Sequence, residues 1–141
     1  MTDTSLRIVL DTNVIVRAIS GRSLSSLIFD ALLNQQFTLC VSTEILLEYE
    51  EKITQIFDAE VAELVVSTLV VLPNVQRTEV YFNLRLIAQD ADDDKFVNCA
   101  FVADAHYIVS EDRHFRILTH VDFPKINVLK FQEFRQLLLQ S

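Results

Sequence analysis

The sequence predicts an α/β fold built around a parallel sheet, and two observations support this prediction. Short runs of aliphatic and β-branched residues alternate with longer stretches whose apolar residues recur at helical spacing, which is the pattern of βαβ units. The 141 residues suit one globular domain, and 50% of them are hydrophobic, enough for a sizeable core without disulfides or metals. We therefore expect residues 1–141 to form a single domain with a central, mostly parallel sheet of four to five strands.

The first predicted strand is the largely apolar run at residues 6–10, which ends directly at Asp11. A short run near Val75 suits an edge strand, and three further runs complete the sheet: residues 37–41, 107–109 and 126–129. Helices are predicted where apolar residues recur every three or four positions. They span residues 24–33, 43–57, 60–72, 95–103 and 131–139. Ser42 or Thr43 caps the second of these helices, and a proline stops the third.

The charge balance excludes one class of function. Twelve basic and 20 acidic residues give a net charge of −8, which argues against a protein that holds duplex nucleic acid by bulk electrostatics, because phosphate affinity needs clustered Lys and Arg. An enzyme that contacts nucleic acid at one local metal site remains compatible with this charge. The single glycine and two prolines exclude collagen, flexible linkers and low-complexity disorder.

The cysteines and the apolar runs indicate a cytoplasmic protein. Cys40 and Cys99 are each flanked by apolar residues and form no C-x-x-C motif, so we expect two buried free thiols in a reducing compartment. The start of the sequence has no basic segment followed by an apolar one, as a signal peptide would. No apolar run reaches the roughly 18 residues that a membrane span needs, so no membrane association is expected.

Acidic residues follow the predicted strands at the places where a site is expected. In open α/β sheets, ligands bind beyond the carboxyl ends of the strands. Asp11 follows the first strand, Glu48 lies in the helix after the second, Asp94 opens the helix before the strand at residues 107–109, and Asp112 follows that strand. Four carboxylates brought together repel one another unless a cation lies between them, and hard cations prefer oxygen ligands. The sequence therefore predicts a Mg²⁺ or Mn²⁺ site.

Each of these acids has a simpler interpretation. Asp11 is a good cap for a helix that starts at Thr12, and Asp112 suits a turn. Glu48 shares a helix face with Glu44, and either carboxylate is compatible with a solvated surface. The acids between positions 90 and 94 favour a helix N-terminus through the helix dipole.

Other side chains carry less information. None of the histidines has metal-ligand spacing, so we interpret them as turn or surface residues: His106, His114 and His120. Arg17 and Arg22 follow the turn at Asp11 and are weak candidates for a phosphate contact. Four phenylalanines form no regular stacking array, and we expect them in the core: Phe115, Phe123, Phe131 and Phe134.

Four motifs, in order, resemble those of PIN-domain proteins. They are IVLDTNV at residues 8–14, VSTEILLEY at 41–49, DDDKF at 92–96 and AHYIVSEDRHF at 105–115. Each motif alone is common, but the four together at this spacing are specific, and the resemblance covers residue 6 to about residue 131. Within that superfamily the chain most resembles the group labelled as toxins of toxin–antitoxin systems.

This resemblance implies a Rossmann-like three-layer α/β/α domain and a Mg²⁺- or Mn²⁺-dependent endoribonuclease that cleaves single-stranded RNA and leaves a 5′-phosphate. It also implies an antitoxin protein as a possible partner. By position, the four acids of the family match Asp11, Glu48, Asp94 and Asp112. Asn13 and Ser110 match the small polar residues that lie beside the metal in the family. Asp92 and Asp93 are neighbours of the third acid, and one of them is a candidate for an outer metal ligand. Glu44 is a weaker match than Glu48 to the second acid.

Three other functions stay open. A haloacid-dehalogenase-type phosphohydrolase would need an Asp two residues after Asp11, where this chain has Asn13. A response-regulator receiver would need a Lys after its last strand, and Lys130 is a poor candidate. A PIN-like module that binds RNA or protein without cleaving it would be expected to lack part of the acidic set, which is complete here.

The predicted helix at residues 60–72 suggests an assembly. It carries more apolar positions than one core-facing stripe uses, so we expect a homodimer or the capture of a partner peptide there. The alternative is a helix buried on both sides.

Overall fold

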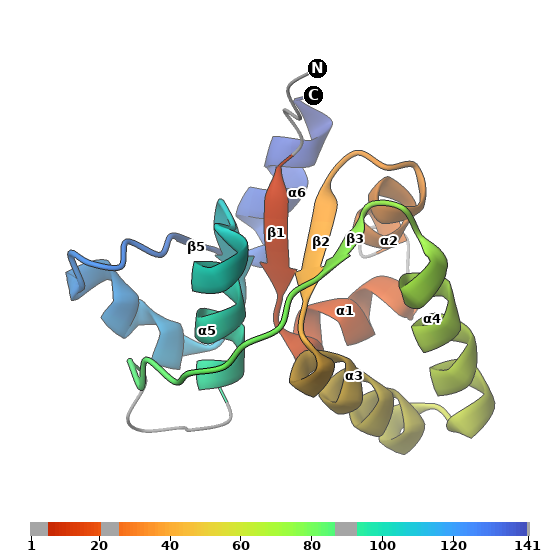
Figure 1. Cartoon of the computed structure of the whole chain (residues 1–141). Helices are drawn as coiled ribbons and strands as arrows, with labels where there is room; N and C mark the ends of the chain where they lie inside the picture. Colours follow the sequence, from red (N-terminus) through yellow and green to blue (C-terminus); the bar gives the residue numbers. More distant parts are fainter. Residues whose placement is uncertain (1–5, 21–25, 87–92, 141) are drawn as a thin grey trace.

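The computed structural model describes residues 6–20, 26–86 and 93–140, and it confirms the predicted α/β fold. Five parallel strands form one sheet in the order β3-β2-β1-β4-β5 (Figure 1). The strands are β1 (Arg7–Leu10), β2 (Thr38–Val41), β3 (Val75–Arg77), β4 (Tyr107–Val109) and β5 (Val128–Leu129). The helices are α1 (Thr12–Ile19), α2 (Ser26–Leu33), α3 (Thr43–Ile56), α4 (Ala59–Val71), α5 (Asp94–Ala103), the 3₁₀ helix η1 (Arg113–His120) and α6 (Phe131–Leu139).

The order of the strands places a switch point at the centre of the sheet. The chain moves from β1 outward to β2 and β3, and then returns to place β4 on the other side of β1. The register pairs Leu10 with Val109, and the backbone N–H of Asp11 donates to the carbonyl of Val109 at 3.0 Å. Ligand sites of open α/β sheets lie beyond the strand ends at such a point. The residues after β1 and β4 are therefore brought together there.

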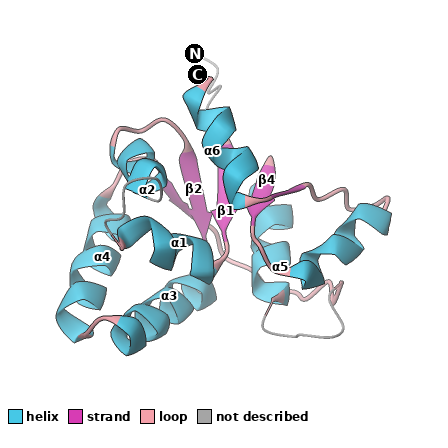
Figure 2. Ribbon diagram, turned by 180° about the vertical axis from the view of Figure 1, so that it is seen from behind, coloured by secondary structure: helices cyan, strands magenta, loops and turns pink. Residues whose placement is uncertain are grey.

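Helices cover both faces of the sheet and give the three layers that the resemblance implies. Helix α5 packs on one face against β1, β2 and β4, whereas α6, with α1 and α2, lies on the other (Figures 1 and 2). The core between the layers consists of buried apolar side chains. Cys40 and Cys99 belong to it as free, buried cysteines, as predicted. Burial raises the pKa of the Cys40 thiol to about 11 and that of Cys99 to about 12.

The structure adds two helices to those expected. Helix α1 follows Asp11 directly, so the simpler interpretation of Asp11 as a helix cap is confirmed. The 3₁₀ helix η1 was not predicted, because only two of its residues, Phe115 and Leu118, are buried, which is too few for a recurring apolar pattern. The last strand is two residues long and begins at Val128. Residues 24 and 25 of the first predicted helix lie outside the described part of the chain.

One prediction about burial is wrong. Phe123 is 83% exposed instead of lying in the core, whereas the other three phenylalanines of that set are buried. Helix α4 has more apolar residues than its core-facing stripe uses, as expected, because Leu64 and Val71 are 69% and 77% exposed; the alternative of a helix buried on both sides is therefore excluded. No helix in the described part of the chain is long and apolar enough to cross a membrane.

Candidate metal centre

A hollow of about 490 Å³ lies at the carboxyl edge of the sheet, where β1, α3, α5 and the segment after β4 meet. Its polar lining is dominated by carboxylates, with two lysines among them. These residues are Asp11, Glu44, Glu48, Glu51, Asp93 and Asp112, with Lys52 and Lys95. The predicted convergence therefore holds for Asp11, Glu48 and Asp112.

Asp11 is a buried carboxylate, with the residue 6% exposed. Its Oδ1 accepts the backbone N–H of Thr12 at 2.7 Å, and its Oδ2 accepts the hydroxyl of Ser110 at 2.7 Å. Burial raises the pKa of Asp11, the two hydrogen bonds oppose this rise, and the charges of Asp112 and Glu48 add to it. The same carboxylate thus caps α1 and faces two like charges, so a cation nearby would stabilise its ionised form.

Glu48 is held in place from two sides. Its Oε2 accepts a hydrogen bond from the hydroxyl of Thr12, and its Oε1 forms an ion pair with Lys95 Nζ at 2.5 Å. The next residue, Tyr49, is fully buried and donates its hydroxyl to the carbonyl of Leu10 at 2.5 Å, which fixes α3 against the end of β1. Glu44, the weaker match to the second acid of the family, also lines the hollow, but its side chain is exposed.

Ser110 links the two strand ends. Besides donating to Asp11, its Oγ accepts the backbone N–H of Asp112 at 2.9 Å. Asp112 in turn accepts the backbone N–H of His114 at 2.9 Å and caps η1. Asp112, for which a turn was the simpler interpretation, is thus the N-cap of a 3₁₀ helix, and it lines the acidic hollow as well.

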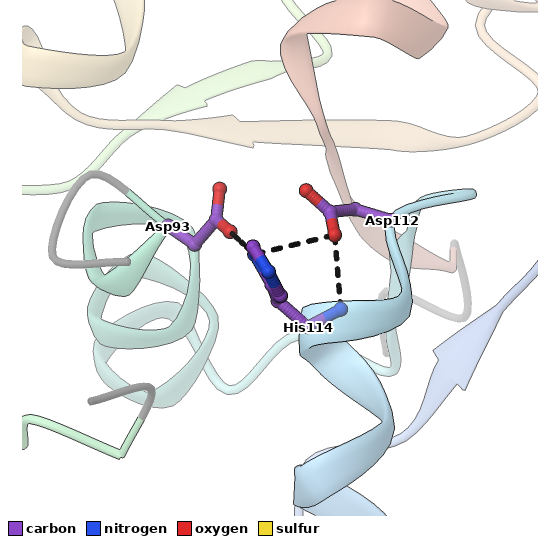
Figure 3. A group of neighbouring side chains, drawn as sticks. All are labelled: Asp93, Asp112 and His114. Carbon is purple, nitrogen blue, oxygen red and sulfur yellow. Dashed lines mark hydrogen bonds and ion pairs between the residues drawn. The ribbon is translucent and has the colours of Figure 1, made fainter. Parts of the chain in front are cut away.

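His114 joins this group, although its spacing gave no metal-ligand motif. Figure 3 shows its imidazole between two carboxylates: Nδ1 lies 3.3 Å from Asp93 Oδ2 and 3.4 Å from Asp112 Oδ1. One ligand atom from each of the three residues lies within 4.8 Å of the others. The only sequence signal was the position of His114 two residues after Asp112 at a helix start, which is too common to identify a site.

The structure brings Asp93 to the acidic hollow, whereas Asp94 lines a neighbouring one. Asp93 precedes α5 and Asp94 is its first residue, and successive positions of a helix point about 100° apart. Asp93 therefore lines the hollow together with Asp11, Glu48 and Asp112, the place that was expected for Asp94. Asn13 lines the acidic hollow and is exposed, and Asp92 lies outside the described residues.

Arg17 does not line the acidic hollow. Its guanidinium lies 3.9 Å from the ring centre of Phe131, as in a cation–π contact. The second candidate for a phosphate contact, Arg22, lies outside the described residues. Lys130, considered for a receiver domain, precedes α6 and is not among the residues that line the hollow.

The residues that lie closest together as ligands are Asp93, Asp112 and His114, which offer two carboxylates and one imidazole nitrogen to a divalent cation. Asp11 and Glu48 are not in that group but line the same hollow, and carboxylate oxygens are the ligands that Mg²⁺ and Mn²⁺ prefer. The ammonium of Lys95 already pairs with Glu48, which shows that this group of carboxylates accommodates a positive charge.

Comparisons with known proteins identify the family and the fold. A family model described as PIN domain matches residues 7–114. No curated protein matches the sequence significantly.

Three solved structures illustrate the likeness in fold. The VapBC2 structure from Rickettsia felis bound to a promoter DNA fragment has a TM-score of 0.60 at 14% identity, covering 89% of this chain and 98% of that one. VapBC-1 from nontypeable Haemophilus influenzae has a TM-score of 0.58 at 15% identity, covering 90% and 99%. A toxin–antitoxin complex from Klebsiella pneumoniae has a TM-score of 0.53 at 14% identity, covering 86% and 95%. At these identities the likeness concerns the fold.

Proposed function

The chain belongs to the PIN-domain family, and from this premise we propose that it is a Mg²⁺- or Mn²⁺-dependent endoribonuclease that hydrolyses phosphodiester bonds of single-stranded RNA. One observation carries the proposal: carboxylates from four separate segments line one hollow at the switch point of the sheet. Residues 1–141 act as a single catalytic domain in this proposal.

The metal ligands in this proposal are Asp11, Glu48, Asp93 and Asp112, with His114 as a further donor. Asp93 takes the position first expected for Asp94 because it, and not Asp94, lines the hollow with the other three acids. A bound ion would supply two effects, a lower pKa for a bound water and stabilisation of the leaving oxygen of the phosphodiester. This chemistry needs no side-chain nucleophile.

The residues around the acids have positioning roles. Ser110 and the backbone of Thr12 hold the two oxygens of Asp11 in fixed directions. The hydroxyl of Thr12 and the ammonium of Lys95 hold Glu48. Before a cation binds, Lys95 offsets part of the repulsion among the carboxylates.

We further propose that the chain is the toxin of a toxin–antitoxin pair and that it acts in the cytoplasm. The similar folds of VapBC and toxin–antitoxin complexes support an antitoxin partner. The two buried free thiols suit a reducing compartment. An exposed leucine, Leu47, which is 60% exposed, lies on the rim of the acidic hollow and offers an apolar contact to such a partner.

Cleavage of mixed single-stranded RNAs with added Mn²⁺ or Mg²⁺ tests the nuclease. Asp11→Asn and Asp93→Asn should each lower the rate by at least about two orders of magnitude, the effect of losing a major transition-state stabiliser. Asp30→Asn is a matched control, because Asp30 is exposed on α2 and is not among the residues that line the hollow.

Three results would contradict the proposal. Full activity in EDTA or in Asp11→Asn would exclude the metal centre. RNA binding without cleavage at any metal concentration would favour the non-catalytic module. Trapping of a phosphorylated Asp11 would favour a phosphohydrolase.

A further inference from the structure

Three phenylalanine rings contact one another beside α5, and we name them the aromatic ridge: Phe82, Phe101 and Phe123. Phe101 lies in α5, Phe82 in the segment after β3, and Phe123 in the segment after η1. The ring centres of Phe82 and Phe101 lie 5.9 Å apart and those of Phe101 and Phe123 lie 6.3 Å apart, both edge to face. Phe82 is 47% exposed and Phe123 is 83% exposed. The aromatic ridge therefore presents open ring surface that the core does not use.

Resting on the proposed function, we propose that the aromatic ridge binds unpaired bases of the RNA strand on one side of the cleaved phosphodiester. Single-stranded RNA is bound by stacking its bases on aromatic side chains. Such stacking accepts any base, because every base has a π face. The ridge therefore adds affinity for single strands without selecting a sequence.

The aromatic ridge lies close to the acidic hollow. Phe82 lines a second hollow of about 330 Å³, which shares Glu44 and Lys95 with the acidic one. Asp93 lines the acidic hollow and is the N-cap of α5, and Phe101 follows eight positions later, roughly 12 Å along the helix axis. A strand of a few nucleotides with its phosphodiester at the acids therefore reaches the ridge.

The segment that leads to Phe123 carries the charge that a phosphate backbone needs. Residues 113–125 contain Arg113, Arg116 and Lys125 against a single aspartate, in a chain whose net charge is −8. All three basic residues are exposed, and none of them takes part in the ion pairs found among the described residues. Three positive charges are therefore available to phosphates beside the aromatic ridge.

The charge on the other side of α5 is of opposite sign. Helices α3 and α4 carry six glutamates and one lysine, and they lie on the side of α5 away from η1 (Figures 1 and 2). These acids repel a phosphate backbone, whereas the basic residues of η1 attract it. A bound strand therefore runs from the acidic hollow towards η1 and the aromatic ridge. The same basic residues favour RNA over an exclusively apolar partner surface as the occupant of the ridge.

Binding without cleavage tests the aromatic ridge separately from the nuclease. A fluorescein-labelled octanucleotide of uridine is titrated with the protein in EDTA, and fluorescence anisotropy gives the Kd. Phe123→Ala should weaken binding by about fivefold or more, which corresponds to the low end of the contribution of one base–aromatic stack. With Mn²⁺ present, the same variant should raise KM for RNA and leave kcat unchanged, because the ridge contacts the strand equally in the ground state and the transition state.

Matched variants separate stacking from apolar contact and from charge. Phe123→Trp keeps an aromatic ring and should retain the affinity, whereas Phe123→Leu keeps apolar volume alone and should bind as weakly as Phe123→Ala. Arg116→Gln should lower the slope of log Kd against log salt concentration by about 0.7, the value for one phosphate contact of a single strand. Leu139→Ala is the control, because Leu139 is 64% exposed on α6, which lies on the other face of the sheet from α5 (Figure 2).

Wild-type affinity in Phe123→Ala or Phe123→Leu would overturn the proposal, and so would a wild type that does not bind the octanucleotide. A dimer mass that is lost only in Phe123→Ala, with RNA affinity unchanged, would assign the aromatic ridge to a second copy of the chain instead. If binding depends on Phe123 but no RNA is cleaved with metal present, the ridge stands and the nuclease proposal fails. If Phe123→Ala cleaves RNA with an unchanged KM, the nuclease stands and the ridge fails.

Discussion

The hydroxyl of Ser110, after β4, donates to the carboxylate of Asp11, after β1, across 2.7 Å and 99 positions of sequence. This bond joins the ends of the two strands that flank the switch point, and the same hydroxyl accepts the backbone N–H of Asp112. One small side chain therefore sets the distance between two of the proposed metal ligands.

Replacing Ser110 with Ala should destabilise the fold and the site together. The buried carboxylate of Asp11 loses a hydrogen bond from a hydroxyl, which costs about 1.5–3 kcal/mol for a charged acceptor. Urea denaturation of Ser110→Ala and wild type measures this difference. Ser110→Thr keeps the hydroxyl and should restore most of the loss, and an alanine variant as stable as wild type would show that the bond contributes nothing.

Mn²⁺ should stabilise the wild type by about 2.7 kcal/mol at 100 times its dissociation constant, because only the folded chain brings the acids together. Asp93→Asn should abolish this gain, whereas Asp94→Asn should retain most of it, since only Asp93 lines the acidic hollow. Urea denaturation with and without Mn²⁺ measures both. The reverse result, with the gain lost only in Asp94→Asn, would return the ligand role to Asp94.

The buried thiols predict a loss of stability at alkaline pH. The pKa of Cys40 is raised from 9.0 to about 11 in the folded chain, so between these values the unfolded chain releases a proton that the folded chain keeps. The contribution of this thiol to stability is therefore complete below pH 9 and falls, by up to roughly 1.4 kcal/mol per pH unit, as the pH rises towards 11. Denaturation from pH 8 to pH 10.5 should show a shallower fall in Cys40→Ala, and identical slopes would count against the buried thiol as the cause.

The exposed apolar stripe of α4 predicts a homodimer. Leu64, Val70 and Val71 are 69%, 56% and 77% exposed on this helix, and such a patch favours a protein contact. Light scattering after gel filtration should give a dimer mass for the wild type and a monomer mass for Leu64→Glu. Leu139→Glu is the control, because Leu139 is 64% exposed and lies on a different helix, α6. A monomeric wild type at high concentration would exclude the dimer.

Much of the fold was determined by local patterns in the sequence. The apolar run before Asp11 forms β1 as predicted, and the helix expected at residues 131–139 matches α6. Because the carboxyl ends of parallel strands meet at one edge, the positions of Asp11, Glu48 and Asp112 after or near these ends were enough to predict that they converge.

Only the tertiary structure decided which neighbouring side chains joined the site. Asp93 and Asp94 are adjacent in sequence, but successive positions of a helix point about 100° apart. The residue at which α5 begins therefore decides that Asp93 lines the acidic hollow and Asp94 lines the adjoining one. His114 contacts Asp93 across 21 positions, and that contact depends on how η1 docks against α5. Periodicity sets which residues share an element, whereas the packing of elements distant in sequence sets which side chains meet.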